Sequence, residues 1–286
     1  MASMRDIKRR KSSIQSTGQI TKAMKLVSTV KLQKAKVKAE ESKPYFKHLY
    51  QVISSMLARS TPEVRERYLS HNPGGKKAIV VISSNRGLAG GYNGNIVKLV
   101  TGSDIAREDA WIYAIGRKGA EALVRKGYEI KEDRSDIINA PLYSDAAELA
   151  ALLMKEYEEG NISEIYIAYT VFKNTVSHVP TLLRLLPTDN FSESDETQSL
   201  SLMNYEPEPE EALQQIMPKF VSGEIYGALI EAIASENGAR MQAMDSATNN
   251  AEDMIATLEL QYNRARQGSI TQELTEIISG ANAINQ

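Results

Sequence analysis

The sequence predicts an α/β domain inserted between two long helices that pair as an antiparallel coiled coil. Three patterns predict this fold class: a helical stripe through the last third of the 286 residues, a basic N-terminal segment almost free of helix breakers, and alternating strands and helices between them. We expect a coiled-coil helix over 1–59, a linker over 60–75, the α/β domain over 76–190, an acidic loop over 191–209 and a second coiled-coil helix over 210–286.

The C-terminal helix carries side chains at alternating spacings of three and four, which keeps one face of a helix against a partner. This stripe comprises Met241, Met244, Thr248, Ala251, Ile255, Leu258, Tyr262, Ala265 and Ser269. After Ala265 the stripe changes phase and continues as Ile270, Leu274, Ile277, Ala281 and Ile284. A phase change alters the supercoil, so the partner should wind loosely or stop there. At ~1.5 Å per residue a helix of roughly 65 residues exceeds any globular core, so it should protrude.

Glycines interrupt this helix at five positions where alanine would be more favourable by about 1 kcal/mol each. They are Gly223, Gly227, Gly238, Gly268 and Gly280. We therefore expect a second surface, either the partner helix or an enclosing protein, to approach closely at these positions.

The N-terminal segment from Ser3 to about Arg59 contains one proline, Pro44, and one glycine. Before Pro44 a stripe is predicted at Ile20, Ala23, Val27, Val30, Lys34 and Val37. After Pro44, where a bend or phase shift is expected, a second stripe follows at Tyr45, Leu49, Val52 or Ile53, and Met56.

Opposite charge favours pairing of the two ends. Residues 1–47 hold thirteen Lys or Arg against three acids, a net +10, and residues 206–286 hold four against thirteen, a net −9. A basic helix also suits nucleic-acid or membrane-surface binding. The acidic second helix favours an intramolecular partner, and the N-terminal segment has few aromatic side chains to stack on bases, so no nucleic-acid partner is expected.

The middle of the chain alternates between β and α patterns, which predicts a mostly parallel, Rossmann-like sheet covered by helices. Strands are expected over 78–83, 110–115, 128–131 and 163–169, and helices over 93–100, 117–126 and 145–158. Residues 176–186 should form an antiparallel strand at the edge, because Pro180 cannot donate to a central ladder.

No catalytic, cofactor or metal site is expected. The glycine-rich turn over 85–94 lacks the Lys-Ser/Thr of a Walker loop and the dinucleotide fingerprint, so it reads as a tight strand-to-helix turn. The glycines at 116 and 119 likewise read as a strand exit rather than a phosphate clamp. There is no cysteine, and the three histidines lack ligand spacing, so zinc and thiol chemistry are not expected. No signal peptide or membrane-spanning run is expected either.

Three segments resemble a known family. Ile20-Thr-Lys-Ala-Met-Lys-Leu-Val27, Ser84-Asn-Arg-Gly-Leu-Ala-Gly90 and Ile270-Thr-Gln-Glu-Leu-Thr-Glu-Ile-Ile-Ser-Gly-Ala281 are similar, in order and spacing, to the gamma subunit of bacterial F-type ATP synthases. The resemblance extends over essentially the whole chain, and the terminal motif is its most specific part.

This resemblance implies a non-catalytic rotor shaft, one copy per complex, in the cavity of an α3β3 hexamer. Its other implied partners are the epsilon subunit and the ring of c subunits, on the cytoplasmic face of the bacterial membrane. Proton flow would turn the ring, and the shaft would drive the β subunits through their states in ATP synthesis or, in reverse, hydrolysis. By similarity, the expected partner contacts are Lys22, Met24, Lys25, Arg240, Arg266, Gln267, Thr271, Gln272, Tyr205 and Glu206.

Two other classes fit the residues alone. A free-standing coiled-coil adaptor would use its terminal helices to dimerise between chains. A small-molecule enzyme would use the α/β domain, and would bind a nucleotide there.

Overall fold

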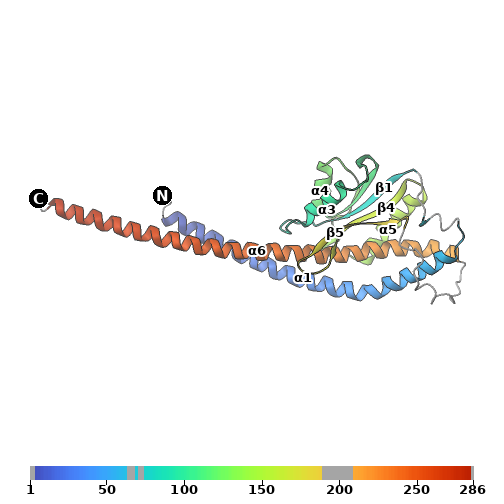
Figure 1. Cartoon of the computed structure of the whole chain (residues 1–286), viewed down its shortest axis with the longest axis horizontal. Helices are drawn as coiled ribbons and strands as arrows, with labels where there is room; N and C mark the ends of the chain where they lie inside the picture. The colour runs from blue at the N-terminus through green and yellow to red at the C-terminus, as the bar shows by residue number, and fades with distance from the viewer. Residues whose placement is uncertain (1–3, 63–67, 70–73, 189–208, 285–286) are drawn as a thin grey trace. The chain divides into compact units, whose positions relative to one another are not determined.

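The computed structural model describes residues 4–62, 68–69, 74–188 and 209–284. The two predicted long helices are present as α1 (Met4–Arg59) and α6 (Pro209–Ile284), and each continues through its internal proline, Pro44 or Pro218 (Figure 1). The chain divides into two compact units, residues 1–28 with 241–286 and residues 29–240. The acidic loop, with Tyr205 and Glu206, lies outside the described residues.

In the first unit α1 and α6 run antiparallel in a single register. Three contacts fix this register: the hydroxyls of Thr21 and Thr248 lie 2.8 Å apart, Lys25 Nζ lies 2.6 Å from Asp245 Oδ1, and Lys11 pairs with Glu259. The residue numbers of each pair sum to 269 or 270. A constant sum requires antiparallel helices without a slip, and the two ion pairs agree with the predicted charge complementarity.

The predicted stripe of α6 is confirmed. Met244, Thr248 and Ala251 are buried, and the other members of the stripe from Met241 to Ser269 are half-buried, while the intervening positions beyond Asn249 are exposed. The 3–4 spacing identified the correct face because no proline and no competing apolar stripe interrupts this part of the helix.

The predicted stripe of α1 is wrong in phase by one to two residues. Ile20, Val27 and Val30 are more than half exposed, and Val37 is 44% exposed. The inward face instead alternates by four and three through Ile7, Lys11, Ile14, Gly18, Thr21, Lys25 and Ser28, then Leu32 and Ala35 in the second unit. Its first heptads are mostly polar or small, so apolar periodicity selected the neighbouring, outward face.

The second unit contains a five-stranded sheet of order β3-β2-β1-β4-β5. Its strands are β1 (Lys76–Ile82), β2 (Ala110–Ile115), β3 (Glu129–Asp133), β4 (Ile162–Phe172) and β5 (His178–Leu186). The first three pairings are parallel and β4–β5 is antiparallel. The predicted edge strand is therefore confirmed, with Pro180 opposite Thr170.

Helices cover both faces of this sheet. They are α3 (Tyr92–Thr101), α4 (Arg117–Arg125) and α5 (Tyr143–Glu158), with short 3₁₀ turns at Arg107–Asp109 and Ile137–Asn139. Alternate residues of β1 point to opposite faces: Ile79 and Val81 pack with α3 and α4, and Val80 packs with α5 and α6. Because both faces are covered, the strand is apolar throughout.

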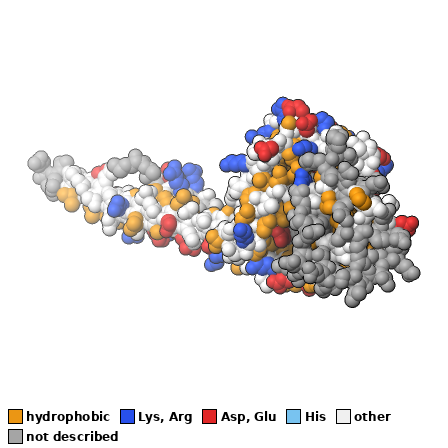
Figure 2. All heavy atoms as spheres, turned by 45° about the vertical axis from the view of Figure 1, so that its right-hand side comes forward, with side chains coloured by type: hydrophobic (Ala, Val, Ile, Leu, Met, Phe, Trp, Pro, Cys, Tyr) orange, Lys and Arg blue, Asp and Glu red, His pale blue; other side chains and the backbone are white. Residues whose placement is uncertain are grey.

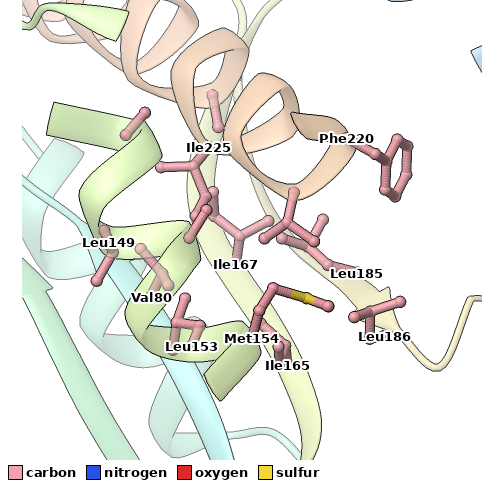
Figure 3. Close-up of a cluster of buried hydrophobic side chains, with 14 of the residues drawn as sticks. Val80, Leu149, Leu153, Met154, Ile165, Ile167, Leu185, Leu186, Phe220 and Ile225 are labelled. Atoms are coloured by element: carbon pink, nitrogen blue, oxygen red, sulfur yellow. The ribbon is translucent and has the colours of Figure 1, made fainter. Parts of the chain in front are cut away.

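The larger core lies between the sheet, α5, α6 and the second half of α1. Figure 3 shows side chains of β1, β4, β5, α5 and α6 pointing toward one another, among them Val80, Leu153, Ile167 and Ile225. Burial of each such side chain contributes about 1.5–3 kcal/mol. From the second predicted stripe of α1, Leu49, Ile53 and Met56 belong to this core, whereas Tyr45 is 51% exposed and is a wrong assignment.

Close approach explains only some of the α6 glycines. A Cβ on Gly223 would lie 2.8 Å from the Phe46 ring, and one on Gly238 would lie 2.5 Å from His178 Nε2. Gly227 would meet Phe46 at 3.8 Å, an ordinary contact. Gly268 and Gly280 have nothing within 4 Å, so no surface of the described chain approaches them.

Candidate functional surfaces

The C-terminal end of α6 has no partner within the described residues of the first unit. In the register above, Met4 at the start of α1 lies opposite Ala265, the position at which the stripe was predicted to change phase. From Ile270 to Gly280 every residue is exposed, including the apolar Leu274, Ile277 and Ile278. We call residues 266–284 the tip. Its apolar side chains between Ile270 and Gly280 contact nothing in the described part of this chain that would bury them.

Four of the expected contact residues lie on the tip. Arg266 and Gln267 are exposed, Thr271 Oγ1 donates to the Gln267 carbonyl at 3.0 Å, and Gln272 Nε2 donates to Glu276 Oε1 at 3.0 Å. These hydrogen bonds remain within α6. The side chains are therefore available on the helix surface, and their role as contacts stays a prediction.

Three more lie within one turn of α1, in different settings. Lys22 is exposed and Met24 is half-buried. Lys25 is bound to Asp245 in the seam between the helices, so its charge is partly matched within the chain. Next to them Ile20, Leu26 and Val27 form an outward apolar face of the helix, and Figure 2 shows hydrophobic side chains on the outer surface of the helical pair.

Arg240 has an internal role in the second unit. It is 9% exposed, its Nη1 lies 2.7 Å from Glu236 Oε1, and its Nη2 donates to the carbonyl oxygen of Gly87 at 3.3 Å. Arg240 therefore joins α6 to the glycine-rich turn. Sequence reasoning missed this link, because nothing in the spacing associates residues 153 positions apart.

A second link joins the same two segments. Tyr92 Oη donates to the carbonyl oxygen of Ala232 at 3.2 Å. Burial raises the pKa of Tyr92 well above its usual value, and the nearby Glu236 carboxylate adds to this shift. The phenol therefore remains a neutral donor. The exposed Leu88, with φ of 62°, protrudes from the turn that these links hold.

The turn itself is fixed by side-chain amides. Asn85 Oδ1 accepts from the Arg117 backbone N–H at 2.9 Å, and Asn85 Nδ2 donates to the Ser135 carbonyl at 2.6 Å. Asn93 Oδ1 accepts from the Ser84 N–H at 2.9 Å. The motif Ser84 to Gly90 thus has a structural function in the α/β domain.

The expected strand exit at Gly116 is confirmed, because β2 ends at Ile115 and α4 begins at Arg117. The N–H of Lys118 donates to the Ser84 carbonyl and the N–H of Gly119 donates to Ser83 Oγ, at 3.0 and 2.9 Å. These are the donors that a phosphate at a helix N-terminus would need, and the protein already uses them. A Cβ on Gly116, whose φ is 111°, would lie 2.2 Å from the Ser83 carbonyl.

The usual ligand position of a parallel sheet is also covered. Strand order reverses between β1 and β4, and ligands in such sheets bind beyond the carboxyl ends at this point. Here Ser235 of α6 donates to the carbonyl oxygen of Thr170 in β4 at 2.8 Å, and Arg240 reaches the turn after β1. α6 therefore lies across the crevice.

Two kinds of feature are absent from the described residues. Among them, no three His, Cys, Asp or Glu side chains are grouped so that they could hold a metal ion. Nor is any described helix both long enough and apolar enough to cross a bilayer.

Two terminal helices that flank a Rossmann-like domain, one continuing past its partner, define the class of this protein as a helical pair with an inserted α/β domain. A family model described as ATP synthase matches residues 3–284. The ATP synthase gamma chain of Lachnoclostridium phytofermentans is 64% identical over all of both chains. The sodium-ion-specific ATP synthase gamma chain of Acetobacterium woodii is 40% identical over 99% of each.

Solved structures with a similar fold include chains of two mitochondrial ATP synthases. A chain in the OSCP/F1/c-ring structure of Euglena gracilis matches 98% of this chain and 94% of its own length, with a TM-score of 0.71 at 18% identity. A chain of the central stalk and c-ring of Tetrahymena thermophila matches 80% and 99%, with a TM-score of 0.61 at 23% identity. The chain belongs to the ATP synthase gamma-chain family.

Proposed function

We propose that this chain is the rotating shaft of a proton-driven F-type ATP synthase, without an active site of its own. Rotation of the c ring would turn the shaft, and its asymmetry would drive the α3β3 hexamer through its catalytic cycle, in either direction. The observation that carries this proposal is the tip, where a long helix continues beyond its partner with apolar side chains exposed.

The tip requires a surrounding surface. Ile270, Leu274 and Ile277 lie on one face of α6 at helical spacing, and each is about half exposed or more. An apolar face of this length is unfavourable in water and marks an interaction site. A sleeve formed by the α3β3 hexamer would bury it, and the open positions at Gly268 and Gly280 leave room for that sleeve to approach.

The remaining contacts follow from the family resemblance. Met24 would face an acidic loop of β, with Lys22 and Lys25 nearby. Arg266 and Gln267 would hold a second loop of β, and Arg240, Thr271 and Gln272 would belong to the same contact network. Lys25 would contribute from its ion pair, and Arg240 by holding the turn that carries Leu88 at the surface. Exposed ion pairs contribute only ~0–1 kcal/mol each, which suits contacts that must form and break during rotation.

The α/β domain would contact the epsilon subunit and the c ring, with Tyr205 and Glu206 near the ring. One shaft would serve each complex, at the cytoplasmic face of the membrane. These partners and this location are proposals that rest on family membership.

Reconstitution tests the shaft directly. Mixed with purified α and β subunits, the chain should form a complex with one copy per six partners, and steady ATP hydrolysis should depend on it. The double variant Leu274→Glu/Ile277→Glu, which places charges in the proposed sleeve, should reduce assembly at least about tenfold.

Ser279→Glu is the control within the tip, because residue 279 lies opposite the face of Leu274 and Ile277. It adds a charge to a polar side of the helix and should reduce assembly less than the double variant does. Failure of the wild-type chain to assemble with α and β would refute the proposal, as would nucleotide hydrolysis by the isolated chain. A double variant that assembles as well as Ser279→Glu would show that the apolar face of the tip does not contribute to binding the hexamer.

A further inference from the structure

A cavity of about 290 Å³ lies in the second unit between α1, the segment before α5, and α6. Three lysines of α1, Lys31, Lys34 and Lys38, line one side of it. The opposite wall is mostly apolar and includes Ile138, Ile230 and Ile233. This combination of a cationic side and an apolar wall is independent of the tip and of the seam in the first unit.

The three lysines share one face of the helix. They occupy positions i, i+3 and i+7, and the side chain between them, Ala35, is 5% exposed. Like charges at these spacings repel one another. Within the described residues none of the three ammonium groups takes part in an ion pair, so the chain itself leaves this repulsion uncompensated.

The acid of the cavity does not neutralise them. Glu236 lines the cavity, but its carboxylate is bound to Arg240 at 2.7 Å, and both side chains are nearly buried. Asn237, which is 4% exposed, adds an amide to the lining. The cavity therefore has a net positive charge, and its volume is close to the lower limit for small-molecule sites.

We propose that this cavity binds a small amphiphilic anion, in which a phosphate, carboxylate or sulfonate is attached to an apolar body. The anionic group would lie among Lys31, Lys34 and Lys38 and relieve their mutual repulsion. The apolar body would pack against Ile138, Ile230 and Ile233. An inorganic anion would gain only the first contribution, and a neutral apolar molecule only the second.

Fluorescence of 1-anilinonaphthalene-8-sulfonate, an aromatic sulfonate, tests the site on the full chain. The variant Lys31→Gln/Lys34→Gln/Lys38→Gln should weaken binding at least about tenfold, since three charge contacts are removed. The control variant Lys98→Gln/Lys126→Gln/Lys173→Gln removes three exposed lysines elsewhere in the second unit and should bind as the wild type does.

Competition then identifies the body of the ligand. Decanoate and ADP are added separately as competitors, and pyrophosphate serves as the anion without a body. Displacement by decanoate indicates an aliphatic ligand and displacement by ADP an aromatic one, with pyrophosphate at least about tenfold weaker than the stronger competitor. Equal binding to both triple variants, or displacement by neither organic anion, would overturn the proposal. The isolated chain is used throughout, so the result is independent of assembly with α and β.

Discussion

Replacement by alanine should change the free energy of unfolding differently at two neighbouring glycines of α6. Gly223 and Gly227 both face the ring of Phe46 in α1, one helical turn apart. At Gly227 a Cβ would meet the ring at 3.8 Å, an ordinary contact. Gly227→Ala should therefore stabilise the second unit by about 1 kcal/mol, the usual difference between the two residues in a helix interior.

At Gly223 the same methyl group does not fit. Its Cβ would lie 2.8 and 2.9 Å from two carbon atoms of the Phe46 ring, so the ring must move in a packed region beside Leu49. Overpacking of this kind costs about 1–3 kcal/mol. Subtracting the ~1 kcal/mol gained in helix propensity, Gly223→Ala should be neutral to destabilising by about 2 kcal/mol.

Urea unfolding followed by the fluorescence of Trp111, the only tryptophan, reports on the second unit. Phe46→Leu should remove most of the difference between the two alanine variants, because the smaller side chain leaves room at Gly223. If Gly223→Ala raised the urea midpoint as much as Gly227→Ala, the close approach of α1 and α6 would not be what selects glycine there.

Three further predictions test other parts of the chain. Ile14→Cys/Ile255→Cys should form a disulfide in this cysteine-free chain, because both residues lie on the inward faces and their numbers sum to 269. The control Ile20→Cys/Asn249→Cys has the same sum but lies on the outward faces, so it should form none. Mobility on a non-reducing gel distinguishes the two outcomes. Gly116→Ala should destabilise the second unit by at least about 3 kcal/mol in urea, since it combines a positive φ with a backbone clash, and Gly94→Ala should be stabilising. Burial lowers the pKa of His178, so the unfolded chain binds a proton there more readily than the folded chain does. The free energy of unfolding should therefore fall as pH drops below about 6.5. His178→Gln should flatten this part of the plot of unfolding free energy against pH, and an unchanged slope would show that another group is responsible.

The parts of the fold that could be predicted are those with a single dominant pattern. In α6 the heptad stripe from Met241 to Ser269 could be predicted, because the seam of this helix is more apolar than its flanks. The phase change after Ala265 stays a prediction. The strand patterns of 78–83 and 110–115 were equally clear, because strands covered on both faces are apolar throughout.

In α1 the pattern gave the right period and the wrong face. The seam opposite α6 contains Gly18, Thr21 and Ser28, which are small or polar, while Ile20 and Val27 face outward. Prediction from apolar periodicity takes the most apolar face of a helix to be the buried one. The hydrogen bond between Thr21 and Thr248 and the ion pair of Lys25 with Asp245 are what distinguish the true seam, and both depend on the register of a partner over 200 residues away.

Among the candidate contacts, too, some structural settings could be predicted from the sequence and others could not. Arg266, Gln267, Thr271 and Gln272 are exposed because α1 begins at Met4, opposite Ala265, and no described segment of the first unit pairs with α6 beyond it. The internal role of Arg240 could not be predicted, since it depends on α6 lying across the carboxyl ends of β1 and β4. The signal in the sequence was the spacing of Glu236 and Arg240, four residues apart, which an ordinary surface ion pair on a helix also has.

The arrangement of polar and apolar groups in the first unit bears on how such a shaft could work. Hydrogen bonds and ion pairs are directional, and here they lie between α1 and α6, where they fix one register and oppose slipping. Apolar contacts are non-directional. The seam contains some of them, such as Met244 and Ala251, and further apolar side chains face outward on α1 and along the tip. A shaft must keep its own helices in register while the surface around it changes at every step. In the proposed shaft, directional bonds in the seam and non-directional contacts outside would satisfy both requirements, and an outward apolar face on α1 would serve the second.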